Sequence, residues 1–250
     1  MTTPAVRIRE LRHDFAGPPA VAVLEGIGLE VLGGQFVSII GPSGCGKSTI
    51  LRVLAGLLQP SGGGECEVHG QLSIGQPGLV GYMPQRDTLL PWRRALANAT
   101  LGAEISGRGK AAARAEAGAL FRQFGLGGFE RAWPSQLSGG MRQRVALLRT
   151  VLAGHDVLVL DEPFGALDAL TRRELQAWLA DLLEKHSRTA ILVTHDVDEA
   201  IWLSDFVIVL SPRPASVRAT IEVSEPRPRP ARFLTDPSFV AHRAAVLAAL

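Results

Sequence analysis

Residues 36–49 read FVSIIGPSGCGKST, an apolar run followed by a glycine-rich segment that leads into a helical pattern. Residues 41–48 fit the pattern G-x-x-x-x-G-K-S/T between a strand and a helix, which is the context that this motif requires. Its glycines let backbone N–H groups turn inward around phosphate oxygens, and the positive end of the helix dipole points at the same oxygens. The stretch therefore predicts a phosphate-binding loop in a strand–loop–helix unit.

Within this loop the last residues have distinct predicted roles. The Lys47 ammonium can reach the β- and γ-phosphates of a nucleotide, and the Ser48 hydroxyl can bind Mg²⁺. The residues predicted to hold the nucleotide are Gly41, Pro42, Ser43, Gly44, Cys45, Gly46, Lys47, Ser48 and Thr49.

A second segment, VLVLDEP at residues 157–163, ends an apolar strand in two acids. Alone, such a pair more often marks a solvated strand end or a helix cap. Beside a phosphate loop, Asp161 is placed to bind Mg²⁺ and Glu162 to take a proton from the water that attacks the γ-phosphate. The two segments together predict nucleotide hydrolysis.

The rest of the chain alternates short apolar runs with amphipathic stretches. Runs at 190–194 and 206–210 read as further buried strands, so we predict an α/β fold with a parallel sheet covered on both faces. Short strands at Val6–Ile8 and Ile27–Val31 predict an N-terminal antiparallel β flank. Strand signals are absent from about 89 to 153, and an Ala-rich stretch at 111–124 is helical in character, which predicts an inserted helical subdomain of approximately residues 87–153.

The chain is predicted to be a single domain over residues 1–250. The EPRPRP stretch at 225–230 cannot continue a helix or a central strand. It predicts an extended linker to a short last helix, together spanning approximately residues 224–250. A net charge of +2, with 46% hydrophobic and 20% charged residues, gives no basis for a nucleic-acid partner or for electrostatic adsorption to a membrane. No apolar run approaches the roughly 20 residues that span a bilayer.

Residues 137–144 read LSGGMRQR, which resembles the signature of ABC ATPases, usually LSGGQ, and departs from it at Met141. A Ser-Gly-Gly turn that opens a helix is a second phosphate-binding nest. The resemblance implies a P-loop NTPase core. It also implies that Ser138, Gly139 and Gly140 contact the ATP held by a second copy of the chain, in a head-to-tail dimer that encloses two ATP.

Other family elements follow in order. Gln85, in GYMPQ, resembles the Q-loop residue that contacts Mg²⁺ and water and senses the γ-phosphate. Asp168, in GALD, resembles the D-loop at the dimer seam. His195, which follows the strand ILVT, resembles the histidine that contacts the γ-phosphate. Phe15 occupies the place of an aromatic residue that stacks on adenine, where the family more often has Tyr, and it fits a core position equally well.

The segment RDTLLPW at 86–92, with Asn98 after it, resembles importer ATPases for nitrate, sulfonate, taurine and thiamine-precursor pyrimidines. This resemblance implies an ATP- and Mg²⁺-dependent subunit, peripheral at the cytoplasmic face of the inner membrane. It implies two transmembrane permease subunits as partners and, indirectly, an extracytoplasmic solute-binding protein. Pro91 and Trp92 could form a knob that receives a short permease helix, or Leu90 and Trp92 could be core residues of the helical subdomain.

Two other classes of function stay open at this point. A soluble ABC ATPase that acts on nucleic acid or protein complexes would need a basic surface or an extra domain, and the near-neutral charge and the chain length favour neither. An interaction module that binds nucleotide without turnover would not need Glu162 and His195.

Overall fold

The computed structural model describes residues 3–250. Its central sheet has the order β10-β9-β3-β8-β7-β6, parallel except for the antiparallel pair β10–β9. Every residue of the three strands β3, β7 and β8 is buried, which explains why the sequence shows continuous apolar runs there. The predicted parallel sheet is confirmed. Its strands are β3 (Phe36–Ile40), β6 (Gly81–Met83), β7 (Val157–Asp161), β8 (Thr189–Val193), β9 (Phe206–Leu210) and β10 (Val217–Glu222).

A second, antiparallel sheet has the order β2-β1-β4-β5 and forms the predicted flank. The predicted extents of its first two strands were wrong, since β1 continues to Phe15 and β2 already begins at Val21. Their pairing shifts register three times between Ile8 and Asp14, and these irregularities break the alternation of polar and apolar residues that marks a strand in sequence. The strands are β1 (Val6–Phe15), β2 (Val21–Val31), β4 (Glu65–Val68) and β5 (Gln71–Leu72).

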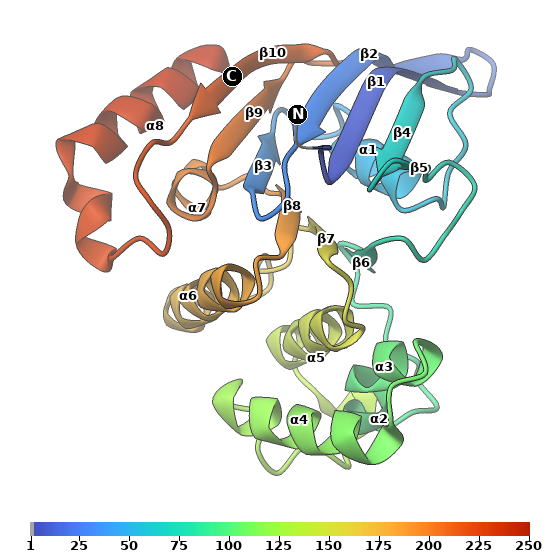
Figure 1. Cartoon of the computed structure of the whole chain (residues 1–250), viewed down its shortest axis with the longest axis vertical. Helices are drawn as coiled ribbons and strands as arrows, with labels where there is room; N and C mark the ends of the chain where they lie inside the picture. Colours follow the sequence, from blue (N-terminus) through green and yellow to red (C-terminus); the bar gives the residue numbers. More distant parts are fainter. Residues whose placement is uncertain (1–2) are drawn as a thin grey trace.

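The middle of the chain is helical, and residues 89–153, all of them described, contain no strand. Figure 1 shows α2, α3 and α4 grouped away from the two sheets, with α5 between this group and α6. The Ala-rich stretch forms α4, whose small side chains Ala113 and Ala117 are buried. The elements are α2 (Ala95–Ala99), α3 (Leu101–Ile105), α4 (Lys110–Gln123), the 3₁₀ turn η1 (Pro134–Gln136) and α5 (Gly139–Leu152).

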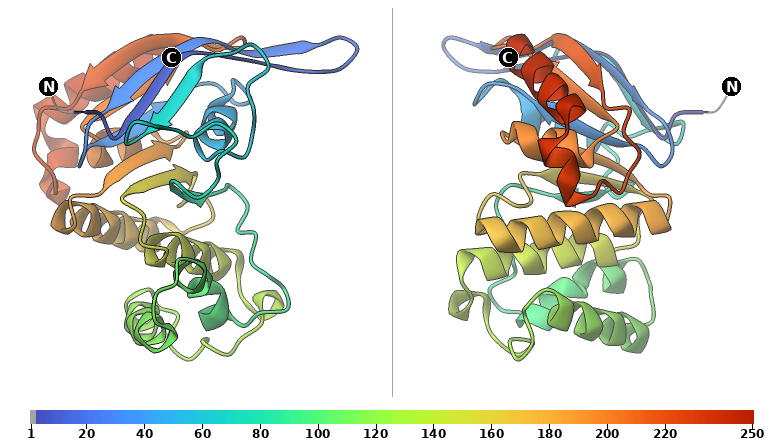
Figure 2. Two further views of the ribbon diagram at one scale, coloured as in Figure 1. Left: turned by 45° about the vertical axis from the view of Figure 1, so that its right-hand side comes forward. Right: turned by 90° about the vertical axis from the view of Figure 1, so that its left-hand side faces the viewer.

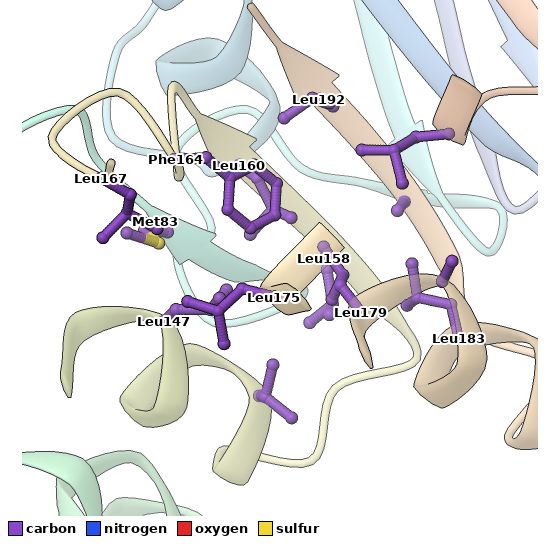
Figure 3. Packing of buried hydrophobic residues seen from close by; sticks show 14 of the residues in the cluster. Met83, Leu147, Leu158, Leu160, Phe164, Leu167, Leu175, Leu179, Leu183 and Leu192 are labelled. Carbon is purple, nitrogen blue, oxygen red and sulfur yellow. The ribbon is translucent and has the colours of Figure 1, made fainter. Parts of the chain in front are cut away.

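Two apolar cores lie on opposite faces of the central sheet. One joins the antiparallel sheet and α1 to the central strands, and the other joins the same strands to α5, α6, α7 and α8. Figure 2 shows these layers from two sides. In Figure 3, Leu147 of α5, Leu158 of β7 and Leu175 of α6 meet in the second core. The remaining helices are α1 (Lys47–Leu54), α6 (Ala169–Lys185), α7 (Val197–Leu203), η2 (Ala231–Thr235) and α8 (Pro237–Ala249).

Hydrogen bonds from Arg229 attach the C-terminal segment to the core. Its side chain is 4% exposed, and burial lowers the pKa of the guanidinium to about 10, so it stays charged at neutral pH. It donates to main-chain carbonyls at the end of α7, after β10 and in the linker, namely those of Ile201, Trp202, Ser204, Val223 and Glu225. Over residues 3–250, no helix is both long enough and apolar enough to cross a membrane.

Candidate functional site

A pocket of about 340 Å³ lies where the central strands end, and its lining comes from seven separate parts of the chain. The phosphate loop contributes most of these residues, and the others come from the Q-loop, from the ends of β1, β7 and β8, from β2 and from the loop between β9 and β10. The predicted site residues that line it are Phe15, Ser43, Gly44, Gly46, Lys47, Ser48, Thr49, Gln85, Glu162 and His195.

The phosphate loop requires glycine at position 46. Gly46 has φ +123°, and a Cβ there would lie 2.7 Å from Leu24 Cδ2 and 2.8 Å from Val23 Cγ1. The loop turns directly into α1, where the N–H of Thr49 donates to the Gly46 carbonyl, and the N–H groups of Lys47 and Ser48 have no partner among the described residues. Lys47 is 8% exposed, and its Nζ donates to the carbonyls of Gly41 at 2.7 Å and Pro42 at 2.9 Å. A cation and free amides therefore converge on one small region, which suits an anion.

Asp161 ends β7 and is only 2% exposed. Burial raises the pKa of its carboxyl group, while the nearby Ser48 hydroxyl acts in the opposite direction. Among the described residues, the buried Oδ1 of Asp161 has no hydrogen-bond partner. A carboxylate oxygen and a hydroxyl beside a phosphate site are the hard oxygen ligands that Mg²⁺ takes. The residues present therefore fit this ion.

Glu162 and His195 face each other across the pocket, with His195 Nδ1 3.4 Å from Glu162 Oε2. Glu162 has φ +48°, an uncommon backbone conformation for a residue with a side chain. Its N–H donates to the carbonyl of Val193 at 2.9 Å, and its own carbonyl accepts from Gln143 Nε2 at 2.7 Å. The backbone of Glu162 is thus held on both sides, and its carboxylate is directed at the pocket.

Gln85 and Phe15 both lie at the pocket. Gln85 also lines an adjoining hollow of about 410 Å³ that is shared with Gly139 of α5, so it stands between the phosphate loop and the signature helix. Phe15 is 42% exposed and packs edge-to-face on His13, with ring centroids 4.6 Å apart. Its position at the pocket rather than in the core favours the stacking interpretation, which stays a prediction.

The signature turn and Asp168 lie outside this pocket. Ser138 is exposed and is the N-cap of α5, where its hydroxyl accepts from the N–H of Met141. Asp168 is the N-cap of α6, and the hydrogen bond from the Thr171 N–H lowers the pKa of its carboxyl. The structure therefore does not bring Ser138, Gly139, Gly140 or Asp168 to the phosphate loop of their own chain.

Sequence reasoning missed Val23, Val193 and Arg213, which also line the pocket. Arg213 is exposed in the loop between β9 and β10, and within residues 3–250 its guanidinium has no hydrogen bond or ion pair. This loop lies against the phosphate loop, since a Cβ on Gly41 would come within 3.0 Å of the Leu210 carbonyl. The sequence SPRP at 211–214 indicates a turn. That this turn lies beside the phosphate loop follows only from the pairing of β9 with β3, the strand that precedes the loop.

The LLPW segment runs from buried Leu89 to exposed Pro91 and Trp92, and Asn98 hydrogen-bonds to it. The Asn98 side chain is fully buried, accepts from the Leu90 N–H at 2.8 Å, and donates to the carbonyls of Leu90 and Arg93 at 3.1 and 2.8 Å. Trp92 is 71% exposed. The alternative that Trp92 is a core residue is therefore wrong, while Leu90 is half-buried.

Comparison with known proteins agrees with this site. The sequence profile of the ABC transporter family matches residues 24–165, more than half of the chain, and the chain belongs to that family. It is 44% identical to an aliphatic sulfonates import ATP-binding protein of Streptomyces avermitilis, over 100% of this chain and 92% of that protein. It is 45% identical to a protein of the same description from Nocardia farcinica, over 98% of this chain and 94% of that one.

Two solved structures resemble the fold closely. The dimeric structure of the bacterial ABC transporter cassette MJ0796 superposes with a TM-score of 0.81 at 28% identity, covering 88% of this chain and 99% of that chain. A post-hydrolysis structure of the same cassette, bound to ADP and phosphate, gives a TM-score of 0.80 at 27% identity. The predicted ABC ATPase fold is confirmed.

Proposed function

We propose that the chain is the ATP-hydrolysing subunit of an ABC importer for a small solute of the nitrate, sulfonate, taurine or pyrimidine type. The observation that carries the proposal is one pocket in which the phosphate loop meets the Glu162–His195 pair, with Asp161 directly before Glu162 at the end of β7. Its cofactors are ATP and Mg²⁺. We take residues 1–250 as one nucleotide-binding domain, with a helical subdomain over approximately 87–153 and a C-terminal linker and helix over approximately 224–250.

Nucleotide binding follows from the charges around the loop. The amides of the phosphate loop and the Lys47 ammonium bind the β- and γ-phosphates. Ser48, Asp161 and Gln85 would hold Mg²⁺, which would neutralise charge on these phosphates. The face of Phe15 receives adenine. We add Arg213 to this set, since an unpaired guanidinium beside Gly44 can contact phosphate.

Hydrolysis needs a base, an oriented water and charge stabilisation. Glu162 takes the proton of the attacking water, because its carboxylate faces the pocket next to the phosphate loop. His195 and Gln85 position the water and the γ-phosphate. Lys47, together with the signature turn of a second copy, stabilises the charge that develops on the phosphoryl group.

The site is completed by a second copy of the chain. Ser138, Gly139 and Gly140 are placed over the phosphates held by the other copy, and Asp168 lies at the seam between the two. The exposure of Ser138 and its separation from its own phosphate loop support this arrangement. The likeness to the dimeric cassette MJ0796 supports it as well.

The permease contact is assigned to a groove of about 560 Å³ between the central sheet and the helical subdomain. Its lining combines apolar Leu57, Leu101 and Ile105 with the cations Arg52 and Arg149, and Ile105 is 79% exposed. Pro84 lies in this groove next to Gln85, so a helix seated here would act directly on the Q-loop. Two permease subunits would hold the dimer at the cytoplasmic face of the inner membrane, with a solute-binding protein on the other side.

The solute itself does not touch this chain. Among the solute types named above, the relatives that are described as aliphatic sulfonates import proteins favour a sulfonate. A soluble ABC ATPase that acts on nucleic acid or protein complexes has no support in these similarities.

The test is affinity purification of tagged Glu162→Gln protein from detergent-solubilised native membranes with MgATP, followed by identification of the co-purifying proteins. We expect a multi-span membrane protein in equal amount. Ile105→Asp should lose that protein while the isolated subunit keeps its ATPase rate. Recovery of soluble partners or nucleic acid alone would overturn the transport assignment.

A further inference from the structure

A single buried amide joins the signature helix to the catalytic loop of the same chain. Gln143, on α5, is 6% exposed. Its Nε2 donates to the Glu162 carbonyl at 2.7 Å, and its Oε1 accepts from the Ala166 N–H at 2.9 Å. Both halves of the side chain are therefore engaged with the segment that runs from Glu162 to Asp168.

This segment has little freedom to move independently of α5. The Glu162 carbonyl accepts a second hydrogen bond, from the Gly165 N–H at 3.2 Å, and the Glu162 N–H is bound to the Val193 carbonyl of β8. At the first turn of α5, a Cβ on Gly140 would come within 3.2 Å of the Ala166 carbonyl. Helix and segment are thus in direct contact as well as hydrogen-bonded.

The two ends of this connection belong to different ATP sites. Gln143 lies five residues after Ser138, about 7–8 Å along the helix axis at 1.5 Å per residue. On the proposed function, Ser138 contacts the ATP held by the second copy, whereas Glu162 acts on the ATP of its own copy. Gln143 is the hydrogen-bonded connection between the two in the same chain.

We propose that Gln143 is a positioning residue, through which the position of the signature helix α5 determines the position of the Glu162 carboxylate. This inference rests on the proposed function, because it requires Glu162 as the base and the signature turn as a contact for the second copy's ATP. ATP binding itself does not depend on it, since the phosphate loop, Lys47 and Asp161 make no hydrogen bond to Gln143 within the described chain.

The main test is Gln143→Met, which keeps the length of the side chain and removes both hydrogen bonds. We expect single-turnover hydrolysis per bound ATP to fall about 10- to 100-fold, the loss typical of a misplaced catalytic group. The Kd for MgATP and the number of ATP bound per chain should stay within about twofold of wild type. The closed dimer should persist in gel filtration with MgATP, which a merely destabilised protein would not show.

Gln143→Glu separates the two hydrogen bonds. It keeps an acceptor for the Ala166 N–H but places a carboxylate oxygen against the Glu162 carbonyl. We expect a loss of rate at least as large as for Gln143→Met. A wild-type rate for this variant would show that the bond to Glu162 has no part in catalysis and would overturn the proposal.

Gln176→Met is the matched control. Gln176 is also a buried glutamine, 5% exposed on α6, but its Nε2 donates to Glu199 Oε1 at 2.7 Å. Its substitution should lower thermal stability without slowing hydrolysis per bound ATP. If Gln143→Met loses ATP-binding capacity in parallel with rate, the residue is only structural and the proposal fails.

Glu162→Gln separates failure of this inference from failure of the proposed function. If Glu162→Gln hydrolyses ATP at the wild-type rate, the assignment of the base is wrong, whatever Gln143 does. If Glu162→Gln is inactive while Gln143→Met turns over like wild type, the base stands and the coupling through Gln143 is wrong.

Discussion

His195 Nδ1 lies 3.4 Å from Glu162 Oε2, and the two residues follow neighbouring parallel strands whose last residues pair in register. Because the carboxyl ends of parallel strands meet at one edge of a sheet, this pairing places the two side chains at one pocket. The relationship explains how residues 33 positions apart come to line one pocket, and it leads to the first prediction.

Glu162→Gln should leave MgATP binding intact and lower turnover about 10²- to 10⁴-fold, because the amide cannot take the proton of the attacking water. Equilibrium binding and phosphate release measure the two effects separately. An unchanged rate of phosphate release would remove Glu162 as the base.

Asp161→Asn should abolish Mg²⁺-dependent hydrolysis and yet raise the melting temperature of the nucleotide-free protein. Burial raises the pKa of the Asp161 carboxyl above its value in the unfolded chain, so the fold disfavours the ionised form. Protonated Asp161 therefore stabilises the wild-type fold at low pH, and the free energy of unfolding falls as pH rises through the raised pKa. The Asn variant carries no ionisable group here, so its stability should not fall in this way. Calorimetry of both proteins between pH 4 and pH 7 measures the difference in melting temperature. A lower melting temperature for Asp161→Asn than for wild type at pH 7 would contradict the prediction.

Gly46→Ala should abolish ATP binding and destabilise the fold by about 1–3 kcal/mol, the usual cost of a side chain in a glycine-only conformation. The new methyl group would meet Leu24 and Val23 at less than 3 Å. Gly118→Ala on α4 is the control, since a Cβ there has no neighbour within 4 Å and should stabilise the helix slightly. Wild-type ATP affinity in Gly46→Ala would show that the phosphate loop can accommodate the added methyl group.

Much of this site is readable from sequence because it consists of short contiguous motifs. The phosphate loop, the Asp161–Glu162 pair and the signature turn each carry their chemistry within a few residues. Arg213 and Gln143 could not be found this way, since the roles proposed for them depend on β9 lying beside β3 and on α5 touching the loop after β7. The antiparallel flank was predicted too short because its strands change register, which hides the period of two.

Arg213→Ala should raise the Kd for MgATP about 3- to 10-fold, as expected for loss of one exposed charge-assisted contact. The rate at saturating ATP should stay close to wild type. Arg114→Ala is the control, since Arg114 is an exposed arginine on α4 with no hydrogen bond or ion pair among the residues described. Titration with a fluorescent ATP analogue measures the affinity of each variant. Equal affinities in the two variants would exclude a contact between Arg213 and phosphate.

Arg229→Met should destabilise the protein by about 2–4 kcal/mol, because several buried carbonyls lose their donor. Arg232→Met, at an exposed arginine of η2, should have little effect. Chemical denaturation of both variants gives the comparison. If they unfold at the same denaturant concentration, the Arg229 network does not hold the C-terminal segment in place.

The separation of Ser138 from the phosphate loop of its own chain has a kinetic consequence. On the proposed function, a lone copy holds only half of the machinery for hydrolysis, so its ATP consumption requires an encounter with another copy. In dilute solution the rate should grow with the square of the protein concentration. Copies that are not yet assembled on a transporter would thus remain nearly idle, and the cell's ATP would be consumed where two copies are held side by side.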